Sequence, residues 1–433
     1  MLITNLTSFA DDQVPGAPQD QPILIQNCTI HPVTSKPIKG AMLFENGKII
    51  QIGKKIKPPK NALVIDAQGK HVYPGLFETH SQIGLTELAA VRATNDFRES
   101  GSINPNVKAL VSIYPDNMNI PVTRSNGVLF AVVAPTGGLI SGKSAVVQLD
   151  GWTYEDMSIR NEATLQVNWP SMSISNRRRA RMTEKEIADA EKRRKLQLIQ
   201  IREYFDAAKR YRDARASDDS NQRYDARLEA MIEVVDGQLP LMVRADRAAE
   251  IQSAVAFGAE QGINIIILGG YDAEMCADVL KKNKVPVIVS AVHRNPQRRD
   301  DGYDRAYDLP ARLHKAGVQF CISGTDRSET WNARNLAYQA GHAVGFGLPE
   351  EEALKSITIH AATILGVDDR IGSLEVGKDA SFIVTDGNPM ETTTEIHAAY
   401  LQGRSVDLNN RQKRLYKKYQ QKYEQLQRAS DKE

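Results

Sequence analysis

The stretch LPLMVRADRAAEIQSAVAFGAEQGINIIILGG, residues 239–270, decides the fold of this chain. A short apolar run leads into a helical pattern, and a second apolar run follows that ends in two glycines. Similar apolar runs recur at residues 128–135, 285–292 and 318–323. Strand and helix in alternation are typical of a parallel sheet covered by helices, so we predict an α/β core.

Both ends of the chain carry strand patterns instead. Residues 23–53 read as short alternating strands, and Asn46-Gly47 supplies the positive φ of a hairpin turn. Strand patterns return at residues 377–389 and 396–406. Because the α/β core lies between these regions, we predict a small composite β-sandwich formed by both chain ends.

The predicted domain organisation follows from these patterns. The leader is rich in proline beyond residue 10 and has no apolar core of its own. The predicted units are a leader at 1–22, a first β-sandwich segment at 23–72, a barrel at 73–374 with a helical insertion at 177–236, a second β-sandwich segment at 375–406, and a charged C-terminal helix at 407–433.

Two of the predicted helices are strongly charged. Residues 177–216 hold 14 Lys and Arg against 7 Asp and Glu, and residues 411–433 hold 8 against 3. Thr183 followed by Glu186 is a capping box, which is typical of a helix start. Each helix has an apolar stripe, so we expect it to dock on the core with a solvated face outside. The alternatives are contact with nucleic acid, a membrane or another subunit.

Composition and the N-terminus bound the class of protein. The chain has 433 residues, 41% of them hydrophobic and 25% charged, and a net charge of +2, so it is not an obvious polyanion binder. Its three cysteines lie far apart and make neither a disulfide framework nor a zinc knuckle, and no run is long enough for a membrane helix. Ser8-Phe9-Ala10 has the small-x-small pattern of a signal-peptidase site. We therefore expect a periplasmic or exported protein that begins near Asp11, with a cytoplasmic location as the alternative.

Residues Gly137–Ser144 match the phosphate-binding pattern GxxxxGKS. A phosphate-binding loop requires a helix that begins at the Lys-Ser pair, because the helix N-terminus holds the phosphates. The residues that follow, AVVQLDG, predict a strand and a turn. A nucleotide-binding loop is therefore only a distant alternative, and a glycine-rich loop at the mouth of a barrel is the better interpretation.

The segment Pro74-Gly75-Leu76-Phe77-Glu78-Thr79-His80-Ser81-Gln82 resembles the first barrel strand of the amidohydrolase superfamily, which usually reads Pro-Gly-Leu-Ile-Asp-x-His-x-His. Residues 353–389 resemble the family's last barrel helix and its return into the sandwich, and Asp326 stands where the eighth strand delivers an Asp. Among amidohydrolases, the sequence is most similar to the imidazolonepropionase-like group. The resemblance implies a (β/α)8 TIM-type barrel and metal-dependent hydrolysis of a C–N bond, with the Asp as proton acceptor for a metal-bound water.

The sequence departs from this family at the metal ligands. His80 and Asp326 match the first ligand and the Asp, but Gln82 replaces the second His and Arg244 the fifth-strand His. The sixth strand ends in Gly269-Gly270, which offers no side chain. Because catalytic zinc normally has three protein ligands and an arginine repels a cation, we predict that zinc binding is weak or absent. His80 could instead be a structural histidine bonded to Asp326.

The candidate site therefore has two groups of residues. The catalytic and metal candidates are His80 and Asp326, with Gln82 as a weak ligand. The substrate-binding or metal-replacing candidates are Arg244, Glu78, Glu87 and His293, and a carboxylate among them is expected to compensate Arg244.

Two functions remain open at this stage. The first is an amidohydrolase-like enzyme acting on a non-peptide C–N bond of a small molecule, metal-assisted if active. The second is a catalytically degenerate barrel that acts as a binding or structural protein. In both cases we expect a small-molecule ligand, a homo-oligomer, no membrane span and no nucleic acid partner.

Overall fold

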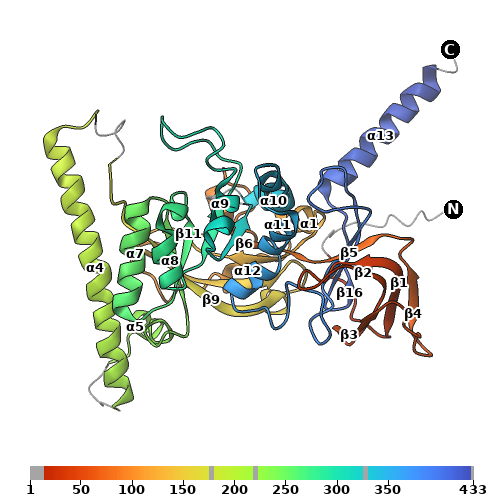
Figure 1. The fold of residues 1–433 in the computed structure, drawn as a ribbon, viewed down its shortest axis with the longest axis horizontal. Coiled ribbons are helices and arrows are strands. Elements are labelled where there is room, and N and C mark those ends of the chain that lie inside the picture. The colour runs from red at the N-terminus through yellow and green to blue at the C-terminus, as the bar shows by residue number, and fades with distance from the viewer. Residues whose placement is uncertain (1–13, 175–179, 218–222, 325–329, 431–433) are drawn as a thin grey trace, which may run out of the picture.

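The computed structural model describes residues 14–174, 180–217, 223–324 and 330–430. Its strands form two eight-stranded sheets. One sheet is built from the middle of the chain and is surrounded by helices, and the other joins the two ends of the chain (Figure 1).

The central sheet is a nearly closed barrel. Its strand order follows the chain in reverse, from β13 to β6, and its strands are buried almost throughout. Continuous runs such as IIILG in β11 are buried on both faces, as expected for a sheet with helices outside. The strands are β6 Leu76–Ser81, β7 Val128–Val133, β8 Ile140–Gln148, β9 Ser158–Asn168, β10 Leu241–Ala245, β11 Ile265–Gly269, β12 Val287–Ser290 and β13 Phe320–Ser323.

One barrel strand runs against the others. β8 is antiparallel to β7 and to β9, whereas the pairs from β9 to β13 and the pair β6–β7 are parallel. The predicted (β/α)8 arrangement is therefore correct for the barrel shape, but its requirement that all strands be parallel is wrong for β8. The reason is the short connection at residues 134–139, because a parallel pair needs a crossover of about a dozen residues or more.

The sheet from the chain ends has the order β16-β15-β14-β5-β1-β2-β3, with β4 paired to β1. β14 pairs with β5, so the two ends of the chain lie side by side as expected. All these strands are hydrogen-bonded in one sheet, so the predicted sandwich is not confirmed, and the rings of Phe44, Phe382 and Tyr400 meet in the core of this unit. The strands are β1 Ile23–Ile30, β2 Ile38–Glu45, β3 Lys48–Gly53, β4 Leu63–Asp66, β5 His71–Pro74, β14 Phe382–Thr385, β15 Ile396–Leu401 and β16 Arg404–Ser405.

Local sequence signals explain several element ends. Asn46 and Gly47 both adopt positive φ between β2 and β3, which confirms the predicted hairpin turn. Thr183 and Glu186 form the predicted capping box. The helices are α1 Asn119–Arg124, α2 Tyr154–Met157, α4 Glu184–Ala216, α5 Ala226–Glu229, α6 Ile232–Val235, α7 Ala248–Gln261, α8 Ala277–Lys282, α9 Leu309–Ala316, α10 Leu336–Gly345, α11 Glu350–Ser356, α12 Ile359–Ile364 and α13 Arg411–Ser430, and the 3-10 helices are η1 Arg92–Thr94, η2 Leu110–Ser112, η3 Ala273–Cys276 and η4 Thr330–Asn335.

The two long charged helices differ in how they meet the body. α4 buries Ile201, Phe205, Ala208 and Tyr211, and the Phe205 ring packs edge-on against Phe257 of α7. α13 has no buried residue and extends away from the body (Figure 1). The prediction that an apolar stripe docks on the core is thus confirmed for α4 and wrong for α13. Among the residues that the structure describes, no helix is both long and apolar enough to cross a membrane.

Candidate functional site

The end of strand β6 brings three of the candidate residues into the barrel. Glu78, His80 and Gln82 alternate along the chain, so their side chains share one face of this extended segment. Their relative exposures are 0%, 1% and 2%. The carboxyl ends of the strands are where barrel enzymes carry their chemistry.

The carboxylate of Glu78 lies where β6 meets β13. The Ser323 hydroxyl donates to Oε1, the Gly324 N–H donates to Oε2 at 2.7 Å, and the His80 N–H donates to Oε1 at 3.2 Å. Burial raises the pKa of Glu78 to about 7, although these hydrogen bonds act in the opposite direction. These contacts show that Glu78 helps to hold the first and last strands of the barrel together.

Arg244 lies within electrostatic reach of the buried His80. Burial, and after it the positive charge of Arg244, lower the pKa of His80 to about 3. Three strands separate β6 from β10 in the sheet, so the charge of Arg244 reaches His80 through the barrel interior. His80 is therefore neutral at physiological pH, and a neutral imidazole has one donor and one acceptor nitrogen.

Gln82 completes this region of the barrel mouth. Its Nε2 donates to Thr136 Oγ1 at 3.3 Å. Its Oε1 is buried and has no hydrogen-bond partner within the described residues of the chain. Leaving a buried carbonyl oxygen unsatisfied costs about 1–3 kcal/mol, so this atom is a place where a ligand's donor would be stabilising.

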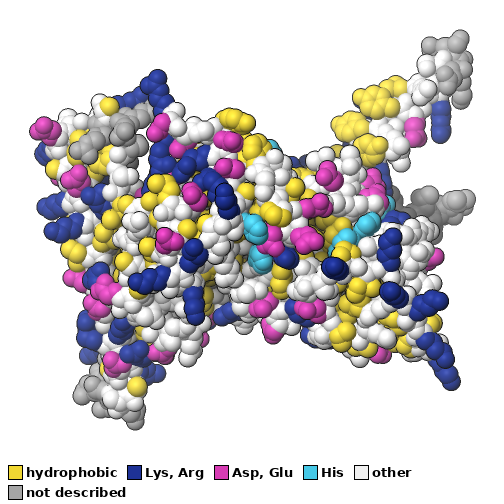
Figure 2. All heavy atoms as spheres, viewed as in Figure 1, with side chains coloured by type: hydrophobic (Ala, Val, Ile, Leu, Met, Phe, Trp, Pro, Cys, Tyr) yellow, Lys and Arg dark blue, Asp and Glu magenta, His cyan; other side chains and the backbone are white. Residues whose placement is uncertain are grey.

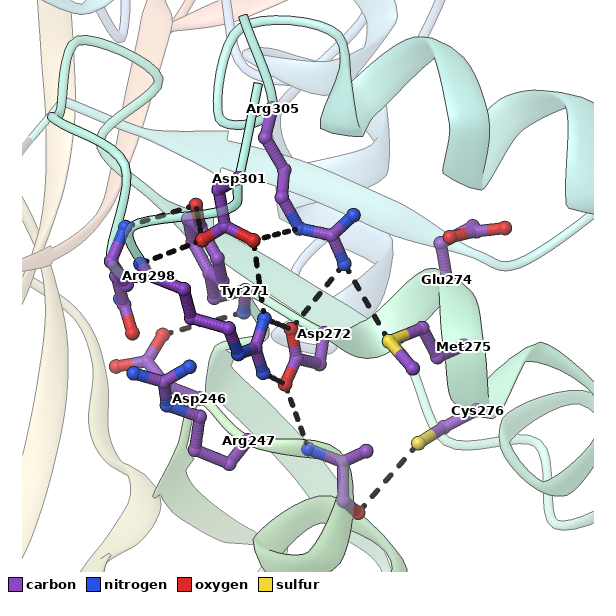
Figure 3. A network of polar contacts seen from close by, with 12 residues as sticks. Asp246, Arg247, Tyr271, Asp272, Glu274, Met275, Cys276, Arg298, Asp301 and Arg305 are labelled. Carbon is purple, nitrogen blue, oxygen red and sulfur yellow. Dashed lines mark hydrogen bonds and ion pairs between the residues drawn. The ribbon is translucent and has the colours of Figure 1, made fainter. Parts of the chain in front are cut away.

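A second polar group lies at the ends of β10, β11 and β12, and we call it the arginine network (Figure 3). The Tyr271 ring is fully buried, and the guanidinium groups of Arg294, Arg298 and Arg305 lie 5.0, 5.9 and 5.6 Å from its centroid. The Tyr271 hydroxyl donates to Asp301 at 2.8 Å.

Two aspartates hold the arginines of this network. Asp272 is buried, forms ion pairs with Arg298 and Arg305, and accepts a hydrogen bond from the Ala248 N–H at the start of α7. Asp301 pairs with the same two arginines. Burial alone would raise the pKa of Asp272, but the hydrogen bond and charge of Arg298 lower it.

Sequence reasoning missed the arginine network. The signal is present, since residues 293–305 read HRNPQRRDDGYDR directly after an apolar strand. The partner residues Tyr271 and Asp272 directly follow Gly269-Gly270 at the end of the preceding strand. Adjacent parallel strands bring their following loops together, so the two sets meet at the barrel mouth.

The other candidate residues are more scattered. Asp326 lies outside the described residues. Glu87 is half-buried in the loop after β6, where its N–H donates to Thr94 O at 3.2 Å. The His293 ring packs edge-on against His342 of α10, at 4.6 Å between centroids, and the backbone N–H of His293 donates to Gln339 Oε1.

Two further basic residues of the barrel, Arg124 and Lys143, are buried. Arg124 is buried at the end of α1, before β7 begins, and it pairs with Asp150 at 2.7 Å. The Lys143 ammonium pairs with Glu162 and with Glu233 of α6. Each is buried with a carboxylate partner, because a buried cation without one would cost several kcal/mol.

The phosphate-loop alternative for Gly137–Ser144 is wrong. Ile140–Gln148 is strand β8, so no helix begins at the Lys-Ser pair. The Ser144 hydroxyl shares a hydrogen bond with the Thr164 hydroxyl in the neighbouring strand. Without a helix N-terminus, the amides that would hold a phosphate are absent from this segment.

Comparison with known proteins agrees with the barrel fold. The family model described as "Amidohydrolase family" matches residues 255–411. The amidohydrolase tasK of Hapsidospora irregularis is 22% identical over 81% of this chain and 38% of its own length, so the chain spans well under half of that relative. The 5'-deoxyadenosine deaminase of Methanobrevibacter smithii is 24% identical over 95% of this chain and 99% of its own.

Two further similarities are local or structural. An imidazolonepropionase of Syntrophobacter fumaroxidans is 34% identical over 19% of this chain and 20% of its own. The crystal structure of an amidohydrolase from Thermotoga maritima MSB8 has a TM-score of 0.78 at 28% identity, covering 89% of this chain and 99% of its own. These similarities support the predicted resemblance to the amidohydrolase superfamily, and the local matches support its imidazolonepropionase-like group.

The described residues at the mouth do not fit the metal that the superfamily implies. His80 offers an imidazole and Gln82 an amide oxygen, but Glu78 accepts three hydrogen bonds and Arg244 places a positive charge on the same site. Zinc normally takes three protein ligands with nitrogen, sulfur or carboxylate donors. Asp386, Glu395 and His397 do lie close enough to share an ion, but they are exposed and lie around the β14–β15 hairpin.

Proposed function

We propose that this chain hydrolyses a C–N bond of a small non-peptide molecule at the mouth of its barrel. The observation that carries the proposal is that the fully buried His80 and Gln82 lie at the carboxyl end of β6 within electrostatic reach of the permanent cation Arg244. Similarity to the amidohydrolase superfamily supports the reaction class. The substrate itself is not identified by these relationships.

Arg244 would stand in for the metal as the group that polarises the scissile carbonyl. A guanidinium cannot lose its proton and can stabilise the negative charge that develops on the carbonyl oxygen. Water then attacks the carbonyl carbon, the C–N bond breaks, and the water's proton passes to the leaving nitrogen. From the resemblance, Asp326 would carry that proton, while His80 and the Oε1 atom of Gln82 would hydrogen-bond the substrate.

A second function is favoured by the same substitutions. The positions of the fifth-strand and sixth-strand ligands are Arg244 and Gly269, so the site lacks donors that the superfamily's chemistry uses. In this case the barrel would bind a small molecule at Arg244 without turnover. The two functions differ in whether the bound molecule is cleaved.

The deciding experiment measures hydrolysis and metal content together. The full chain is purified without a chelating tag, and its metal content and its hydrolysis of an imidazolone and of an aminopurine nucleoside are measured with and without chelator. We expect slow turnover that survives chelation and falls by about 100-fold in Arg244→Met, which is the usual effect of removing an oxyanion-stabilising group.

Arg299→Met is the matched control, since it removes the same charge from an exposed position of the arginine-rich loop. Activity that rises in proportion to bound zinc would overturn the role of Arg244. Saturable binding of a substrate analogue without turnover in any condition would establish the second function instead.

The remaining expectations extend this proposal. We propose a small-molecule ligand, a homo-oligomeric state and the domain division at residues 22, 72, 374 and 406. Export stays a proposal too, because the expected cleavage site near Asp11 lies outside the described residues. Mass spectrometry of the protein from its native cell tests export, and an intact Met1 in a cytoplasmic fraction would contradict it.

A further inference from the structure

Helix α13 has a side-chain arrangement that the proposed function does not use. The helix extends from the body, and hydrophobic side chains are visible along it in the space-filling view (Figures 1 and 2). Its five large apolar side chains are between 41% and 70% exposed. These are Leu415, Tyr416, Tyr419, Tyr423 and Leu426.

The two faces of α13 are chemically distinct. At about 100° per residue, the five apolar side chains project within an arc of about 100°, and the basic side chains within a separate arc of about 180°. Glu424 is the one acidic residue of the helix. The basic residues are Arg411, Lys413, Arg414, Lys417, Lys418, Lys422 and Arg428.

Contacts just before the helix attach its N-terminal end to the body. Arg124 Nε donates to Asp407 O at 3.0 Å, and Asn410 Nδ2 donates to Ser125 Oγ at 2.8 Å. Leu415 lines a groove of about 220 Å³ together with Trp331, which is 45% exposed. The apolar face of α13 therefore continues onto an exposed tryptophan of the body.

A second copy of this helix does not match the surface. A two-helix seam through Leu415, Tyr419 and Leu426 would include Lys422, which lies over the Tyr419 and Tyr423 rings at 5.9 and 6.0 Å. Two such helices would also bring their basic faces close together, and like charges repel. Nucleic acid would pair with the basic face but leave the leucines and tyrosines in water.

We propose that α13 binds the surface of a bilayer that contains anionic lipid, lying in its interface without crossing it. Basic amphipathic helices with this division of faces bury the apolar face at the headgroup boundary and pair the basic face with anionic headgroups. Tyrosine and tryptophan are favoured at that depth, since each has an apolar ring and a polar tip. Binding through α13 would hold the barrel next to a membrane.

The test is co-sedimentation of the full chain with phosphatidylcholine vesicles, with and without phosphatidylglycerol. We expect binding to the anionic vesicles only. The variant Lys417→Glu, Lys418→Glu, Lys422→Glu should lose about a hundredfold or more in partitioning, because each basic residue near an anionic surface contributes roughly a fivefold factor. Since α13 buries no residue, thermal unfolding of this variant should be unchanged.

Two matched variants make the test specific. Lys192→Glu, Arg193→Glu, Lys195→Glu introduces the same charge change on the exposed half of α4 and should bind like the parent chain. Tyr419→Ser, Leu426→Ser keeps every charge of α13 and should lose about tenfold, through the lost apolar burial.

Several results would overturn the proposal. Equal binding to both vesicle types would exclude an electrostatic role, and undiminished binding of the Tyr419→Ser, Leu426→Ser variant would exclude insertion of the apolar face. Absence of vesicle binding, with tight duplex DNA binding that depends on Lys417, Lys418 and Lys422, would identify nucleic acid as the partner. Dimerisation lost in the Ser variant, again without vesicle binding, would identify a second copy.

Discussion

The two sides of the barrel mouth bury their carboxyl groups in opposite ways. On the β6 side, Glu78 accepts hydrogen bonds from neutral donors, and burial raises its pKa to about 7. On the β11 side, Asp272 is equally buried but is held by Arg298 and Arg305, and its pKa is lowered. The comparison shows that a positively charged partner can outweigh the effect of burial on the pKa of a carboxyl group, whereas neutral donors alone do not.

The largest expected effect on stability comes from removing Asp272 from the arginine network on the β11 side. Asp272→Ala removes one of the two carboxylates that hold Arg298 and Arg305, and it removes an acceptor at the start of α7. We expect a loss of about 3–4 kcal/mol in the free energy of unfolding, since removing one partner of a buried pair is costly. Chemical denaturation measures it. Glu274→Ala, which breaks a partly exposed ion pair with Arg312, is the control and should cost about 1 kcal/mol or less.

The raised pKa of Glu78 on the β6 side should make the free energy of unfolding depend on pH. The folded pKa of Glu78 is raised above its ordinary 4.5, so its contribution is fully present below pH 4.5 and is lost as pH rises through about 7. The parent chain should lose about 3 kcal/mol across this window relative to Glu78→Gln, which cannot ionise. Denaturation curves at several pH values measure this difference. Parallel pH profiles for the two chains would show that the pKa of Glu78 is not raised by folding.

Restoring the histidine ligands that are usual in the superfamily tests whether the β6 side of the barrel mouth can bind zinc. Gln82→His together with Arg244→His adds two imidazoles beside His80 and removes the repelling cation. Zinc affinity should rise by at least about 100-fold, because histidine is a far better zinc ligand than an amide. Isothermal titration with zinc measures the change, and Gln82→His alone is the control that keeps Arg244. An unchanged affinity in the double variant would show that these positions do not converge.

The smallest expected effect concerns the Tyr271 hydroxyl. Tyr271→Phe keeps the ring beneath the three arginines but removes the hydrogen bonds to Asp301 and from the Gln297 N–H. The free energy of unfolding should fall by about 1–2 kcal/mol, the usual value for a buried hydrogen bond to a charged group. Chemical denaturation measures this loss. A loss as large as that of Asp272→Ala would mean that the hydroxyl, rather than the aspartate, organises the arginine network.

Much of the fold could be predicted because its signals are local. The turn at Asn46-Gly47 and the capping box at Thr183 depend on residues next to each other in the chain. The reversed direction of β8 was not foreseen, although it also has a local cause in the short connection before it. The site was foreseen only incompletely: Glu78, His80 and Arg244 come directly from strand ends, whereas the arginine network depends on loops that meet in space.

The sequence by itself determined which residues can form strands, helices and turns, and its resemblance to a family led to the prediction that the usual zinc ligands are incomplete. Only the tertiary structure decided which charges meet. The contacts of Tyr271 with Arg298 and Arg305 join loops after two different strands, and no spacing along the chain specifies them. The same holds for α4 and α13, two charged helices with similar stripes, of which only α4 is covered. Burial depends on whether another segment of the chain reaches a surface, and this is a property of the whole fold.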